Sequence, residues 1–221
     1  MTPTLRGRYG ALLLILLGTL LAQPFLGAGR VAEVFLDFTF LAVFMVTIPS
    51  IWHNRKLRLV AITLGIFAVL SSTTGRSLGV DSIYPLGAGA RAVFFAALIY
   101  IIFSDILRRP QINMDAVFGA CCVYVLLGIS WSAVYSLLEW VYPGSFHFTE
   151  FAGSASFGAT TTSFKLEYFS LITMTSVGYG EIVPVSPPAQ MTAALQALFG
   201  QLYLAIIIGR LVGLAVRKLP E

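Results

Sequence analysis

The sequence predicts an all-α membrane protein with six transmembrane helices and a short re-entrant helix between the fifth and the sixth. The chain of 221 residues is 57% hydrophobic and 11% charged, whereas soluble domains carry about 25% charged residues. Its apolar runs are long enough to cross a bilayer as helices, which takes roughly 20 residues per span. The segment between the last two runs contains glycines and a proline, so it cannot be a spanning helix.

Six apolar segments are the predicted spans. Barrel strands are excluded because they would alternate in polarity over about 10 residues each. The spans are expected at residues 10–26, 31–52, 59–72, 90–107, 115–141 and 189–218. The first imitates a secretion signal, but Leu20 is a poor residue three positions before a cleavage point.

Two domains are expected along the chain. Residues 1–110 are expected to form a four-helix transmembrane domain, and residues 111–221 a second domain with the last two spans and the re-entrant segment. A polar, glycine-rich loop over residues 73–89 is expected to precede the fourth span.

The basic residues predict the orientation of the chain. If the N-terminus is cytoplasmic, most Arg and Lys residues fall on the inner side, as positively charged loops do in membrane proteins. The outer side then carries Arg30, Arg76, Arg91 and Lys165. We therefore expect a multi-pass protein of the plasma (cell) membrane with both termini cytoplasmic. The formal net charge of +4 is explained by this bias, and no nucleic-acid partner is expected.

The segment before the sixth span has the residues needed to hold a dehydrated cation. Residues 163–175 are expected to form a short helix, with Ser163 as its N-cap. The helix macrodipole places about half a negative charge at the C-terminal end, which favours a cation there. A bare buried ion otherwise costs on the order of 20 kcal/mol, so oxygen ligands must replace its water.

Backbone carbonyls after this helix are the expected ligands. Gly178 and Gly180 adopt positive φ freely, which lets successive carbonyls face one axis while Val177 and Tyr179 point away from it. A hydroxyl from Ser176 or Thr175 adds an oxygen at the inner mouth. One such strand cannot surround an ion, so a homotetramer around a central axis is expected.

The run Thr173-Met-Thr-Ser-Val-Gly-Tyr-Gly180, with Pro184 and Gly200 at their expected places, resembles the selectivity-filter motif of the potassium channel superfamily. The resemblance covers about residues 116–218 and rests on span count alone before that. It implies a K⁺-selective channel subunit with a pore helix, a filter, K⁺ as the permeant ion, and no cofactor. Gly200 then corresponds to a proposed gating hinge. The implied filter residues are Thr175, Ser176, Val177, Gly178, Tyr179 and Gly180, with K⁺ at the first five.

The filter region departs from the family pattern at several positions. Ser176 replaces a usual threonine, and Glu181 replaces a usual aspartate. Phe169 stands where tryptophan is frequent, so a Trp-to-carboxylate clamp behind the filter is expected to be absent, and Ile172 excludes a buried carboxylate at its position. Residues expected to support the filter are Thr173, Glu181, Phe169 and Glu139.

Charged residues also occur in or beside the other spans, where plain anchoring at the membrane boundary is the alternative to a functional role. The fourth span is uncharged over residues 92–104, so no arginine-ladder voltage sensor is expected. Glu33 and Asp37 share a helical face and are either an ion or proton site or a polar outer end. Asp105 is expected to pair with Arg109. Arg210 is expected to snorkel to the inner surface, the alternative being a place at the pore mouth.

Other functional classes find little support. Cys121 and Cys122 are adjacent in an apolar run, and His53 and His147 lie far apart, so no metal site is expected. The sequence lacks a Ser/His/Asp set, and an enzyme is not expected. The alternatives kept open are a carrier or pump subunit with a borrowed pore loop, and a less selective cation channel.

Overall fold

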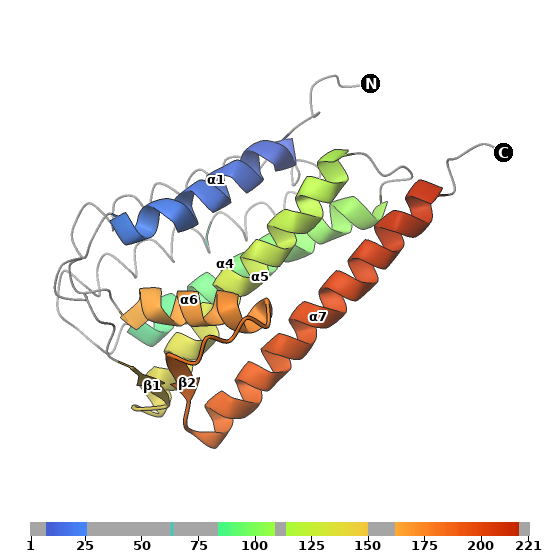
Figure 1. The fold of residues 1–221 in the computed structure, drawn as a ribbon. Helices are drawn as coiled ribbons and strands as arrows, with labels where there is room; N and C mark the ends of the chain where they lie inside the picture. The colour runs from blue at the N-terminus through green and yellow to red at the C-terminus, as the bar shows by residue number, and fades with distance from the viewer. Residues whose placement is uncertain (1–7, 26–62, 64–83, 109–113, 150–161, 217–221) are drawn as a thin grey trace.

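The computed structural model describes residues 8–25, 63, 84–108, 114–149 and 162–216, and these are mostly helical (Figure 1). The elements in chain order are α1 (Arg8–Ala22), η1 (Gln23–Phe25), α4 (Tyr84–Arg108), α5 (Met114–Val141), β1 (Phe146–Phe148), α6 (Thr162–Met174), β2 (Ile182–Pro184) and α7 (Pro187–Val216).

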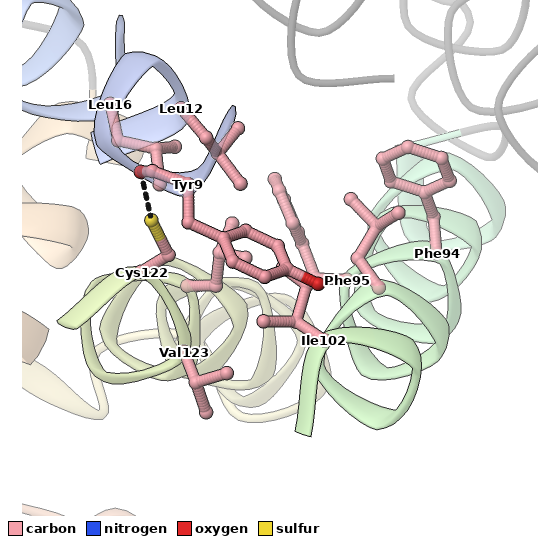
Figure 2. Close-up of a cluster of buried hydrophobic side chains, with 10 residues drawn as sticks. Tyr9, Leu12, Leu16, Phe94, Phe95, Ile102, Cys122 and Val123 are labelled. Carbon is pink, nitrogen blue, oxygen red and sulfur yellow. Dashed lines mark hydrogen bonds between the residues drawn. The ribbon is translucent and has the colours of Figure 1, made fainter. Parts of the chain in front are cut away.

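Helices α1, α4 and α5 share one apolar core. Tyr9 of α1 inserts its ring between α4 and α5, and its carbonyl accepts a hydrogen bond from Cys122 Sγ at 3.4 Å (Figure 2). Helix α4 contributes Leu98 and Ile102, both fully buried. The Tyr9 hydroxyl donates to Asp105 Oδ2 at 2.7 Å, while Arg109, the expected partner of Asp105, lies outside the described residues.

A second core lies where α6 packs between α5 and α7. Three aromatic rings meet there edge to face: Tyr135 and Phe146 at 5.3 Å between centroids, Tyr135 and Phe169 at 5.1 Å, and Phe146 and Phe169 at 5.4 Å. Each such pair contributes about 0.5–1.5 kcal/mol beyond its buried area. This cluster fixes the middle of α6 against α5 and against β1.

The two short strands form an antiparallel pair on either side of the re-entrant segment. Their register pairs Phe146 with Pro184, His147 with Val183, and Phe148 with Ile182. Figure 1 shows this pair at one end of the helices, whereas α4 and α7 end, and α1 and α5 begin, at the other.

Two of the described helices are candidate membrane spans by length and composition. These are α5, over Met114–Val141, and the Pro187–Ile207 part of α7. Helices also occupy the places of the expected first and fourth spans, but their apolar stretches, Tyr9–Phe25 and Ala92–Leu107, are shorter. The expected spans at 31–52 and 59–72, with Glu33 and Asp37, lie outside the described residues. The part of the chain that the structure describes is thus mostly helical and contains two candidate spans.

Two predicted boundaries were wrong. Residues 84–89 were expected in a loop, yet α4 begins at Tyr84. Pro85 is the reason this is possible, because proline fits the first turn of a helix, where its missing N–H has no intrahelical acceptor. Ser163 was expected as the cap of the short helix, but α6 begins at Thr162, which places Ser163 inside the first turn.

Candidate functional site

The segment after α6 has an alternating backbone. Ser176, Gly178 and Gly180 have φ of +59°, +53° and +91°. Positive φ was expected at the two glycines and was missed at Ser176, because a serine gives no sequence signal for it. A residue with a Cβ costs about 1–2 kcal/mol in this conformation, so its surroundings must hold Ser176 there.

Backbone amides of this segment bond the last turn of α6. Ser176 N donates to Thr173 O at 3.0 Å, and Val177 N donates to Ile172 O at 2.9 Å. Thr173 is half-buried, and Ile172 is buried. These bonds satisfy carbonyls that a helix end otherwise leaves free, and they fix where the segment leaves the helix.

The two hydroxyls that were alternatives for the inner mouth have different partners. The Thr175 hydroxyl donates to Leu171 O at 2.8 Å. The Ser176 hydroxyl oxygen accepts from Gln201 Nε2 at 2.9 Å. Thr175 is therefore tied to its own helix, while Ser176 is tied to α7.

All six residues from Thr175 to Gly180 are exposed in the single chain. Tyr179 is 73% exposed and Val177 is 49% exposed. For an aromatic and a β-branched side chain beside two apolar helices, such exposure marks a surface that another molecule can cover.

A buried polar network behind α6 escaped the sequence reasoning. The Ser170 hydroxyl donates to Gly128 O at 2.6 Å, and Gln196 Nε2 donates to Ser170 Oγ at 2.7 Å and to Ser170 O at 3.0 Å. The Tyr135 hydroxyl donates to Gln196 Oε1. Ser170, Tyr135 and Gln196 are at most 1% exposed. The available signal was a glutamine within an apolar span, where polar side chains are costly and often have a function.

Two glycines allow α5 and α7 to approach α6 closely. A Cβ on Gly128 would lie 2.7 Å from Leu171 Cδ2, and a Cβ on Gly200 would lie 2.4 Å from the backbone oxygen of Met174. The position of Gly200 is thus explained by close packing against the end of α6. A hinge at Gly200 stays a prediction.

Glu139 braces the turn between α5 and β1. Its two carboxylate oxygens accept from Gly144 N at 2.9 Å and from Phe146 N at 3.1 Å. Because β1 begins at Phe146 and pairs with β2, Glu139 reaches the exit of the re-entrant segment only through the strand pair.

The aromatic partner of Glu181 is Tyr168, which the sequence reasoning overlooked. Phe169 is buried in the aromatic cluster, where its ring contacts Tyr135. Burial raises the pKa of Tyr168 to about 12, and hydrogen bonding and charge from the Glu181 carboxylate add to the rise. The sequence predicted only that a Trp-to-carboxylate clamp would be absent, and the aromatic side chain beside this carboxylate is the phenol of Tyr168. Glu181 Oε1 is buried without a hydrogen-bond partner among the described residues.

Two further contacts tie the region to the rest of the chain. Gln23 Nε2 donates to Glu167 Oε2 at 3.4 Å, which joins η1 to α6. Arg210 is exposed, and its Nη2 donates to Leu107 O at 3.4 Å, near the C-terminal end of α4. A guanidinium suits that position because helix C-terminal ends carry partial negative charge.

No metal-ligand group of three or more His, Cys, Asp or Glu side chains occurs in the part of the chain that the structure describes. Cys121 is exposed and Cys122 is buried, and both are free thiols.

Residues 123–217, from within α5 to the end of α7, match the protein-family model described as "Ion channel". The match covers somewhat less than half of the chain and includes α6, the alternating segment and both candidate spans in large part. It supports an ion channel domain in a membrane protein, and so favours transport over catalysis. No curated protein matches the chain significantly.

Proposed function

We propose that this chain is one subunit of a potassium-selective channel that conducts K⁺ passively through a pore formed by four copies. The observation that carries the proposal is the alternation of positive φ at Ser176, Gly178 and Gly180, directly after the C-terminal end of α6. Residues 175–180 are then the selectivity filter, α6 is the pore helix, and K⁺ is the only small species required.

Alternating backbone conformations suit the coordination of a dehydrated cation. In an ordinary strand, successive carbonyls point to opposite sides. A chain that alternates between negative and positive φ turns successive carbonyls toward one side, and neutral carbonyl oxygens replace the hydration shell of K⁺. We assign K⁺ ligands to the carbonyls of Thr175, Ser176, Val177, Gly178 and Tyr179. Gly180 turns the chain out of the filter.

The end of α6 adds a favourable field. Helix α6 ends at Met174, immediately before the alternating segment, so the negative end of its macrodipole adjoins the proposed ion path. The neighbouring polar groups are the neutral Gln201 amide and the Glu181 carboxylate.

A homotetramer follows from the single filter strand in each chain. Closed rotational symmetry is the usual way for identical chains to complete one site. The exposed apolar surface supports this, because it continues from the filter along α7 as a set of side chains that lipid or neighbouring copies would cover. These side chains are Val177, Tyr179, Met191, Leu195, Leu198, Phe199, Leu202 and Ile206.

The proposed setting is the plasma membrane, with both termini cytoplasmic. Helices α4 and α7 end on the side where α1 and α5 begin (Figure 1), and Arg108 and Arg210 lie toward that side, as the positive-inside bias requires of a cytoplasmic face. In this arrangement residues 111–221 form the pore domain. Residues 1–110 form the four-helix domain, which brings the number of spans to six.

Gly178→Ala tests this proposal in liposomes that contain purified protein. A Cβ at Gly178 meets nothing within 4 Å in the single chain, so the substitution acts through the positive φ, at about 1–2 kcal/mol per copy. We expect loss of selective K⁺ flux.

The matched control is Gly144→Ala, which has φ of +80°, has the same open space and lies in the turn before β1. We expect it to keep the K⁺ flux. Undiminished K⁺ flux in Gly178→Ala would refute the proposed filter. Wild-type flux of K⁺ and Na⁺ at equal rates would support the alternative of an unselective cation channel.

A further inference from the structure

Gln201 of α7 reaches the start of the proposed filter. Its Nε2 donates to Ser176 Oγ at 2.9 Å, although the two residues are 25 positions apart in the sequence. Gln201 and Ser176 are both exposed in the single chain. The contact therefore lies at a surface, beside the residue with which the alternating backbone begins.

The preceding glycine explains why residue 201 reaches this position. At Gly200 the backbone of α7 comes so close to Met174 that a Cβ would lie 2.4 Å from the Met174 oxygen. Met174 ends α6, and Ser176 follows two residues later. The next side chain along α7 is therefore brought to the first residues after α6, and a glutamine is long enough to reach the hydroxyl.

The contact changes what the Ser176 hydroxyl can offer to a cation. A serine hydroxyl has one proton and two acceptor lone pairs. Donation from Gln201 engages one lone pair and places the positive end of an amide dipole beside the oxygen. The contact also helps to hold Ser176 at φ of +59°, a conformation that its Cβ disfavours.

We propose that Gln201 is a specificity-determining residue, which sets how tightly the innermost cation is held by the Ser176 hydroxyl. This inference rests on the proposed channel function and deepens it. The amide weakens cation binding at the inner mouth, because it competes with the cation for the hydroxyl oxygen. Removal of the amide frees that oxygen and strengthens binding of a cation that arrives from the cytoplasmic side.

The test measures block of K⁺ current by Ba²⁺ applied from the α7 C-terminal side, for the full-length protein in planar bilayers. Gln201→Met keeps a similar volume and removes the donor. We expect Ba²⁺ to block this variant about 2- to 12-fold more tightly, which is the range that the net free energy of one hydrogen bond gives. Gln190→Met is the matched control, because Gln190 lies on the same helix and contacts Pro184 O and Val185 O instead.

Ser176→Ala shows whether the effect passes through the hydroxyl. In that background, the exchange of Gln201 for Met should leave Ba²⁺ block unchanged. Gln201→Asn, which keeps an amide but is shorter by one methylene, should shift Ba²⁺ block in the same direction as Gln201→Met.

Unchanged or weaker Ba²⁺ block in both Gln201 variants would overturn the inference. An equal shift with and without the Ser176 hydroxyl would also overturn it. A wild-type protein that carries no K⁺ current would instead refute the proposed function, so the two failures are distinguishable.

Discussion

Replacement of Gln196 by leucine should destabilise the protein through a single buried hydroxyl. Gln196 makes three hydrogen bonds, one from Tyr135 and two to Ser170. Ser170 keeps its bond to Gly128 O in the variant, but the proton of the fully buried Tyr135 hydroxyl loses its acceptor, Gln196 Oε1. A buried polar group without a partner costs about 1–3 kcal/mol. The single variant should therefore lose free energy of unfolding in that range.

Loss of one hydrogen-bond partner costs more than loss of both, and a double variant tests this difference. When both partners of a hydrogen bond are replaced by apolar groups of similar shape, the free energy of unfolding changes little. Tyr135→Phe combined with Gln196→Leu should therefore be more stable than Gln196→Leu alone. Gln190→Leu, at an exposed position of the same helix, should leave stability unchanged.

The assay is the free energy of unfolding of purified protein in detergent micelles, obtained by titration with sodium dodecyl sulfate and followed by circular dichroism. If the double variant is at least as destabilised as Gln196→Leu, Tyr135 is not the group left unpaired, and the reasoning fails. If Gln196→Leu is as stable as the wild type, the network does not stabilise α6.

Two further predictions concern the packing of α7 and the effect of Tyr168 of α6 on the pH dependence of stability. Gly200→Ala should lose about 1–3 kcal/mol of unfolding free energy in the same titration, the usual cost of overpacking, because the contacted atom is the backbone oxygen of Met174. Gly209→Ala, where a Cβ meets nothing within 4 Å, should be neutral or stabilising, and equal stability of the two variants would contradict the close approach. Since the folded state raises the pKa of Tyr168 from 10.0 to about 12, folding keeps its proton, and stability should fall as pH rises through this window. Tyr168→Phe should reduce that fall, and a slope equal to that of the wild type would contradict a raised pKa at Tyr168.

The parts of the fold that were predicted well are those that the residues of a single segment determine. The positions of α5, α6 and α7 follow from apolar run lengths and from the glycines that interrupt them, and the structure places these helices within two residues of expectation. The alternation at Gly178 and Gly180 was predicted for the same reason, because glycine is the residue that adopts positive φ without strain. The start of α4 was missed because Pro85 and the glycines after it are typical of loops as well as of a first turn.

The missed features depend on contacts between distant residues. Ser176 adopts positive φ beside Gln201, a residue on another helix, and no local pattern predicts that pair. The network of Tyr135, Ser170 and Gln196 joins three helices, and its sequence signal was weak, because Gln196 is one of three glutamines in the last apolar span. Tyr168 was overlooked because the family pattern places an aromatic residue at the next position, Phe169. Which of the two side chains lies beside Glu181 depends on how α6 is rotated about its axis.

The most direct test of the central claim is the reversal potential of the wild-type protein in a planar bilayer, with concentrated K⁺ on one side and, on the other, dilute K⁺ made up with Na⁺ to the same total concentration. A filter of carbonyls lined up by the alternating backbone at Ser176, Gly178 and Gly180 predicts a current that reverses close to the K⁺ equilibrium potential. A current that reverses near zero, with Na⁺ carried as readily as K⁺, would contradict it.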